Sequence, residues 1–311
     1  MFGGLEVLDE IRLNFSSDSL KLLNLTLAFI MFGVALDLKI LRFKHVLLRP
    51  KATIIGVLAQ FIIMPFFTFL LVILINPTPG VALGMILVAA CPGGNISNFM
   101  TAHAKGNTEL SVSLTAIADF SAIIMTPLNF AFWGGMYARF YNRASNLVIP
   151  VEIDAWEMMK TMILLLGIPL IIGMLFAKQF PKITAIIRKP IKILSLIIFS
   201  GYVIAALASN FNHFINYVHY IFLIVLIHNA IALCTGFSLS KIFKLKKRDV
   251  RTITIETGIQ NSGLALVLIF NPNLFNGIGG MAFIAALWGI WHIVAGLSIA
   301  TLWSLKPVYS K

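Results

Sequence analysis

The chain has 311 residues, of which 59% are hydrophobic and 12% are charged, and its formal net charge at pH 7 is +12. Because a soluble domain carries about twice that fraction of charged residues, the composition excludes a soluble globular protein. Several apolar stretches reach roughly 20 residues, the length that a helix needs to cross a hydrocarbon core of about 30 Å, so we expect an all-α polytopic membrane protein.

Residues 1–21 come first, and they are acidic and mixed in character. They lack the basic start and the apolar core of a signal peptide, so we expect a short extracellular N-terminal segment. Apolar runs then define nine candidate spans, at residues 22–38, 51–75, 80–104, 108–134, 158–177, 191–209, 217–240, 250–270 and 278–304. We expect a first repeat of four spans at 22–134, a second repeat of five spans at 158–304 and a cytoplasmic tail at 305–311.

Lys and Arg gather in alternate loops. They follow the first, fifth and seventh spans, whereas the loops at 76–80, 210–217 and 271–277 contain none. By the positive-inside rule the basic loops are cytoplasmic, which puts the N-terminus outside and the C-terminus inside a cell (inner) membrane. The positive charge is therefore an orientation signal, and we expect neither a nucleic-acid partner nor a protein partner.

Two of the spans are interrupted by residues that break helices. The third contains Pro92, Gly93 and Gly94 followed by polar side chains, and the eighth contains ETGIQNSGLA at 256–265. The third span enters from outside and the eighth from the cytoplasm, so the two halves of the chain are inverted relative to each other. Paired interruptions in inverted halves are typical of a transporter whose binding site lies near the midplane.

A helix broken within a membrane exposes N–H and C=O groups, and each group costs several kcal/mol unless protein, water or ligand satisfies it. Carbonyls that end a first half-helix suit a cation, and N–H groups that start a second half-helix suit an anion. Glu256 lies about six residues into its span, where an ionisable side chain costs about 3 kcal/mol unless it is paired or protonated. Arg248 and Arg251 are its alternative partners if the span starts later.

These motifs resemble those of the bile acid:sodium symporter family. ACPGGNISN (90–98) is similar to one broken helix of the family, ETGIQNSGLA to the other, and GNTELSVSLT (106–115) and the region of Gln60 extend the match. The chain is identified as a bacterial member in the nine-span form, which lacks the family's first helix. The resemblance implies an inverted-repeat transporter with a panel domain, a core domain and two discontinuous crossing helices.

The resemblance also implies two sodium ions where the broken helices cross. The first site would use side chains from three spans: Ser97, Asn98, Ser111, Thr115 and Glu256. The second site would share the carboxylate and add two amides and two backbone carbonyls: Gln60, Glu256, Thr257, Ile259 and Gln260. Oxygen ligands suit a hard cation such as sodium. Ordinary helix–helix hydrogen bonding is the alternative interpretation of Gln60, Ser111 and Thr115.

An organic anion is the solute that the resemblance implies. The candidate contacts are three residues at the starts of second half-helices and one at a cavity-lining position: Asn95, Asn261, Ser262 and His292. For His292, a neutral ring bonded to a neighbouring helix is the alternative.

Asp119 departs from the family pattern, which usually has a small or hydroxylated residue there. It shares a helix face with Ser111 and Thr115, because the three positions are four residues apart. A second intramembrane carboxylate would shift ion coupling or admit a proton. The alternative is a carboxyl group that is protonated or hydrogen-bonded away from the site.

We expect a sodium-coupled symporter that moves an organic anion, either a bile acid-like solute or a small carboxylate, across the lipid bilayer by alternating access. The alternative is a proton- or sodium-coupled antiporter or efflux carrier of the same fold. Cys91 keeps an arsenite-carrier-like activity open, because those carriers use a cysteine in a broken helix. A membrane sensor that binds its ligand without transport is a distant alternative. An enzyme is not expected, because the sequence contains neither HExxH nor GxSxG.

Overall fold

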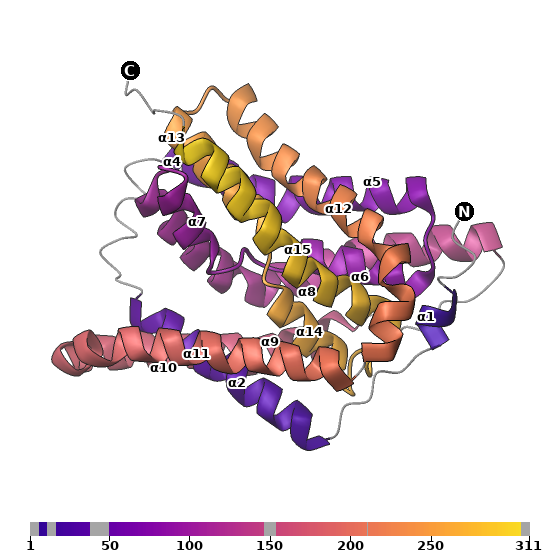
Figure 1. Cartoon of the computed structure of the whole chain (residues 1–311), viewed down its shortest axis with the longest axis horizontal. Coiled ribbons are helices and arrows are strands. Elements are labelled where there is room, and N and C mark those ends of the chain that lie inside the picture. Colours follow the sequence, from indigo (N-terminus) through magenta and orange to yellow (C-terminus); the bar gives the residue numbers. More distant parts are fainter. Residues whose placement is uncertain (1–5, 11–16, 38–49, 146–153, 210, 306–311) are drawn as a thin grey trace.

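A computed structural model of the chain describes residues 6–10, 17–37, 50–145, 154–209 and 211–305. Within these residues the structure is almost entirely helical, and it contains no strand (Figure 1). The basic loop expected at 39–49 and the tail residues 306–311 lie outside the described residues.

The helices follow the order of the predicted spans. The first span is α2 (Ser17–Asp37), and the second is one continuous helix made of α4 (Pro50–Leu58), η2 (Ala59–Ile63) and α5 (Met64–Ile75). The third span is the broken pair α6 (Pro79–Ala90) and α7 (Ser97–His103), and the fourth is α8 (Thr108–Ser145). The later spans are α9 (Ala155–Met162), η3 (Ile163–Gly167) and α10 (Ile168–Gln179) as one rod, α11 (Pro181–Ser209), α12 (Phe211–Ile242), α13 (Lys247–Gly258) with α14 (Ser262–Phe270), and α15 (Gly279–Ser304).

Five helical rods in the described part are long and apolar enough to cross a membrane, at Pro50–Ile75, Thr108–Tyr141, Ala155–Gln179, Ile221–Ile242 and Gly279–Ser304. Shorter apolar helices cover Asn24–Leu36 and Pro79–Ala90. The fold class, an all-α polytopic membrane protein, is confirmed. The inverted relation between the two halves stays a prediction.

Helices α8 and α11 differ most from the boundaries expected. Helix α8 runs on to Ser145, past the predicted end at 134. Helix α11 begins at Pro181 instead of 191, so Lys182 and Arg188 of the expected basic loop lie on a helix. Proline at the first helical position explains this early start, because its fixed φ suits a helix and its missing N–H has no intrahelical partner there anyway.

Two π-helical turns, η2 and η3, have a local cause in the sequence. Each lies just before a proline, Pro65 after η2 and Pro169 after η3. A proline inside a helix has no N–H for the carbonyl four residues back, and its ring clashes with that carbonyl. The wider turn relieves the clash, and in η2 the N–H of Met64 bonds the carbonyl of Ala59, five residues back. Gln60 therefore projects from a π turn.

The helices gather in two groups. Helix α2 packs closely on α10 and α11, and Figure 1 shows these three on one side of the molecule. The broken pairs α6–α7 and α13–α14 lie in the other group, where α6 packs on α15 and α13 packs on α12. The division into a panel domain and a core domain stays a prediction.

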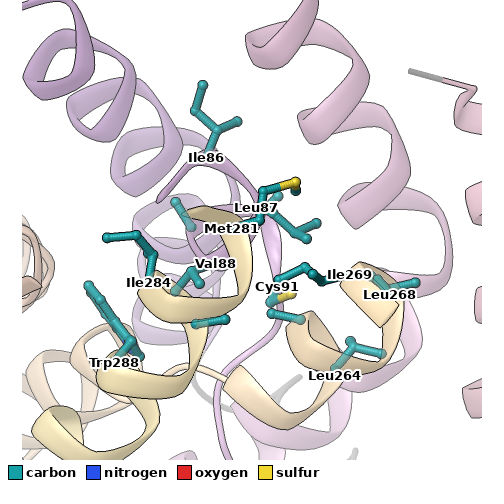
Figure 2. Close-up of a cluster of buried hydrophobic side chains, with 14 of the residues drawn as sticks. Ile86, Leu87, Val88, Cys91, Leu264, Leu268, Ile269, Met281, Ile284 and Trp288 are labelled. Atoms are coloured by element: carbon teal, nitrogen blue, oxygen red, sulfur yellow. The ribbon is translucent and has the colours of Figure 1, made fainter. Parts of the chain in front are cut away.

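Protein surrounds both of the short half-helices α6 and α14. Their 12 and 9 residues give lengths of about 18 Å and 14 Å, too short to cross a bilayer alone. Every residue of α14 and nearly every residue of α6 is buried, as expected for helices that are apolar on all faces. Figure 2 shows side chains of α6, α14 and α15 in one apolar cluster, among them Leu87, Leu268 and Met281.

The short N-terminal helix α1 (Glu6–Glu10) docks on the start of α6. Leu8 is fully buried, and Asp9 Oδ2 accepts a hydrogen bond of 2.7 Å from the backbone N–H of Gly80. A Cβ atom on Gly80 or on Gly280 would lie 2.2 or 2.3 Å from Asp9 Oδ1, so glycine at both helix starts makes room for the carboxylate.

Candidate ion and solute site

The two interrupted helices break where the sequence predicts and pair with each other at the break. Helix α6 ends at Ala90 before Pro92, and α13 ends at Gly258. The unwound segments form an antiparallel bridge between Gly93 and Gln260. Gly94 N donates to the carbonyl of Ile259 at 2.7 Å, and Asn261 N donates to the carbonyl of Pro92 at 2.8 Å. Each break thus satisfies part of the backbone of the other, as a membrane interior requires.

Glu256 lies at the centre of a cluster of side-chain oxygens. Its side chain is buried on α13, and Oε1 accepts from Ser97 Oγ at 2.8 Å and from Ser111 Oγ. Oε2 accepts from Thr115 Oγ1 at 3.1 Å. Asn98 completes the group, with Oδ1 2.9 Å from Ser111 Oγ and Nδ2 3.2 Å from Thr115 Oγ1. The structure therefore brings together all five residues of the first predicted site.

The hydroxyl groups in this cluster face more acceptors than they have hydrogens. Ser111 Oγ lies within hydrogen-bond distance of Glu256 Oε1 and Asn98 Oδ1. Thr115 Oγ1 lies within such distance of Glu256 Oε2, Asn98 Oδ1 and the Ser111 carbonyl. Each hydroxyl has one hydrogen, so two hydrogens serve four different acceptor atoms. A surplus of buried oxygen atoms of this kind favours a cation.

The second predicted group is brought together only in part. Gln60 Nε2 donates to Gln260 Oε1 at 2.7 Å and to the Cys91 carbonyl at 2.9 Å, and Gln260 Nε2 donates to the Thr257 carbonyl at 3.0 Å. The Ile259 carbonyl accepts from the opposite break instead. Several of the oxygens expected to bind sodium thus already accept hydrogen bonds. Rotating the two amides would free the Gln260 and Thr257 oxygens, whereas the Ile259 carbonyl would keep its bond from Gly94 N.

The arginines close to Glu256 in sequence bind elsewhere. Arg251 Nη1 donates to the Ala104 carbonyl at 2.6 Å, and Arg248 donates to the Gly106 carbonyl at 3.1 and 3.3 Å. These carbonyls follow the C-terminal end of α7, where a helix dipole favours a cation. The carboxylate of Glu256 takes its hydrogen bonds from hydroxyl groups, so the expectation of arginine partners is not supported.

The four predicted solute contacts lie in different surroundings. Asn95 and Asn261 are partly exposed, and the Asn261 side chain caps α14 by accepting from Leu264 N at 3.0 Å. Ser262 is buried against α15, where its Oγ would lie 2.7 Å from a Cβ on Gly289. His292 is buried on α15.

Side-chain caps on the half-helix ends were not expected from the sequence. Thr126 Oγ1 of α8 donates to the Ala90 carbonyl at 2.7 Å, and Asn229 Nδ2 of α12 donates to the Gly258 carbonyl at 2.7 Å. The carbonyls that end α6 and α13 are therefore not free for a cation, which corrects the simple picture of an open helix end. The carboxylate cluster is the better cation site.

The chain was compared with known proteins. Residues 24–217 match the Sodium Bile acid symporter family. The chain is 32% identical over 283 residues to the sodium-dependent transporter YocS of Bacillus subtilis, covering 90% of this chain and 82% of that protein. It is 30% identical over 293 residues to the probable chloroplastic sodium/metabolite cotransporter BASS1 of Arabidopsis thaliana, covering 93% and 68%. It is 27% identical over 301 residues to the human sodium-dependent organic anion transporter, covering 95% and 75%. These relatives are transporters, so the prediction of a sodium-coupled transporter and not an enzyme is confirmed.

Proposed function

The chain belongs to the sodium bile acid symporter family, and from that premise we propose that it is a symporter that carries an organic anion together with two sodium ions. The solute is a bile acid-like compound or a small carboxylate. Transport runs by alternating access across a cell (inner) membrane, with the N-terminus outside and the C-terminus in the cytoplasm.

The observation that carries this proposal is the oxygen cluster around Glu256. A buried carboxylate without a counter-charge costs several kcal/mol, and the described neighbours of Glu256 supply hydroxyl groups instead of a cation. A sodium ion placed among Ser97, Ser111 and Thr115 would offset the charge and take the lone pairs that the few hydroxyl hydrogens leave unsatisfied.

The second sodium ion is assigned to the amide side of the same carboxylate. Gln60 and Gln260 are buried and already in contact there, and the Thr257 and Ile259 carbonyls lie at the end of α13. Sharing Glu256 places two positive charges on one carboxylate, so an anionic solute near the crossover would complete the charge balance.

Sodium would raise the affinity for the solute by fixing the crossover. Ser97 and Asn98 start α7, and Glu256 lies at the end of α13, so an ion bound to all three joins both broken helices. Asn95 and Asn261 lie at the same breaks and are partly exposed. An ion that holds the breaks in one geometry lowers the ordering cost of binding the solute, which is positive coupling.

The test begins with a thermal-shift screen of carboxylates and steroid conjugates, with sodium and with choline in its place. A compound that stabilises only with sodium is then followed in proteoliposomes under an inward sodium gradient. We expect saturable, sodium-dependent uptake that E256Q and Q260A abolish. E109Q, which changes an exposed carboxylate on α8, is the matched control. Wild-type uptake by E256Q with unchanged sodium dependence would refute the site.

The alternatives give different results in the same vesicles. Uptake or exchange driven by a pH gradient without sodium would favour a proton-coupled antiporter, and binding without counterflow would favour a sensor. The arsenite-carrier-like alternative receives little support, because Figure 2 shows Cys91 among the apolar side chains of α6 and α14, with Leu264 and Ile269 nearby.

A further inference from the structure

Asp119 of α8 is buried and carries a carboxyl group that no described residue serves. Its exposure is 0%, and neither Oδ1 nor Oδ2 has a hydrogen-bond partner among the described residues. Other enclosed carboxylates in the described part do have partners: Glu256 accepts from hydroxyl groups, Asp249 accepts from Asn107 Nδ2 at 2.7 Å, and Asp9 accepts from Gly80 N. An unpartnered buried carboxylate is costly, so the group either takes a proton or binds a cation.

Contacts on either side of Asp119 fix its level along α8. Thr115, one turn before it, contacts Glu256 and Asn98, and Thr126, two turns after it, contacts the last carbonyl of α6. The rise of a helix puts Asp119 about 6 Å along the axis from Thr115. Asp119 therefore lies level with the unwound segment 91–96, between the carboxylate cluster and the end of α6.

The surroundings of Asp119 favour a positive charge. The C-terminal end of α6, which is the negative end of its helix dipole, lies near this level of α8, although the Ala90 carbonyl itself is capped by Thr126. Glu256 adds a second carboxylate. Arg251 is the one buried Lys or Arg side chain in the described part of the chain, and it donates to the Ala104 carbonyl beyond α7. A cation beside Asp119 would offset a charge that no described side chain balances.

We propose that Asp119 binds a third sodium ion, held by its carboxylate at the level of the unwound segment 91–96. This inference rests on the proposed function, because it adds an ion to the two assigned above. The third ion lies next to the first site without sharing its hydroxyl ligands. One more positive charge would then cross the membrane with each solute molecule, which steepens the dependence of transport on the sodium gradient.

The test counts bound ions and needs no solute. Equilibrium binding of radioactive sodium to the purified full-length chain in detergent gives the number of ions per chain at saturation. We expect three for the wild type, two for D119N and three for E109Q, which removes an exposed carboxylate from the same helix. E256Q is measured in parallel, and it should lose the ions that share that carboxylate.

Each outcome of the sodium-binding measurement decides a different part of the proposal. Equal stoichiometry in the wild type and D119N overturns the third site, including the case in which Asp119 holds a proton. Two ions in the wild type overturn the third site and leave the proposed function intact, whereas no bound sodium in the wild type overturns the proposed function itself. If D119N fails to fold, the wild-type count alone decides between three ions and two.

Discussion

Substituting Thr126 measures how much the hydrogen bond that caps the end of α6 contributes to the free energy of unfolding. Its hydroxyl donates to the Ala90 carbonyl at 2.7 Å, and both residues are fully buried. In a continuous helix that carbonyl would accept from Gly94 N, four residues on, but Gly94 N bonds to Ile259 across the crossover. Replacing Thr126 by Val keeps the side-chain volume and removes the donor, so no cavity contributes to the result.

The magnitude lies between two limits. Interhelical hydrogen bonds in membrane proteins average about 0.6 kcal/mol, because the unfolded chain in a membrane also finds partners. Leaving a buried acceptor unsatisfied costs about 1–3 kcal/mol. Since the Ala90 carbonyl has lost its usual donor within the helix, we expect T126V to lower the free energy of unfolding by about 1–2 kcal/mol.

The assay is unfolding in mixed micelles with increasing SDS, followed by tryptophan fluorescence. T126S keeps the hydroxyl and loses only the packing of one buried methyl group, about 0.8 kcal/mol, so it should be less destabilised than T126V. Thr101 supplies the matched control, because its side chain is equally buried and its Oγ1 has no partner in the described part of the chain. T101V should therefore cost nothing. A T126V chain as stable as the wild type, or a T101V chain that loses as much, would refute the reasoning.

Three further predictions concern ions, the N-terminal helix and close helix packing. Replacing sodium by choline should lower thermal stability, by about 2.7 kcal/mol for each site at sodium 100 times its Kd, and an unchanged melting curve would count against bound sodium. D9N removes the charge that Gly80 N bonds to at 2.7 Å, and it should cost about 1 kcal/mol in SDS unfolding; an unchanged midpoint would show that this bond contributes nothing. G84A would place a Cβ 2.8 Å from Met281 Cα and should cost about 1–3 kcal/mol, whereas G135A has nothing within 4 Å and should be tolerated; equal stability of the two variants would contradict the packing.

The breaks and the first ion cluster were within reach of the sequence. Pro92, Gly93 and Gly94 cannot continue a helix, and their position inside an apolar run marks an interruption within the membrane. Ser111 and Thr115 are one turn apart, so their hydroxyls share a face. Their contact with Glu256 followed from the resemblance, since spacing alone does not say which helix lies opposite.

Other features depended on contacts between distant helices. Neither Thr126 nor Asn229 carries a local signal of capping, because each caps a carbonyl on a different helix. Gln60 was predicted as a ligand, but its place on a π turn follows from the register shift before Pro65. The docking of Asp9 on the start of α6 depends on the tertiary fold and not on residues 1–21 themselves.

The backbone bridge between Gly93 and Gln260 has a mechanical consequence. Its main-chain hydrogen bonds hold the two unwound segments together, so these segments cannot separate without exposing polar backbone groups to lipid. If the solute crosses by alternating access as proposed, the broken helices α6–α7 and α13–α14 move as one rigid body. The surface that slides is then their interface with α2, α10 and α11. A covalent cross-link between the two unwound segments should then leave the transport rate unchanged. A cross-link across the interface with α2, α10 and α11 should stop transport.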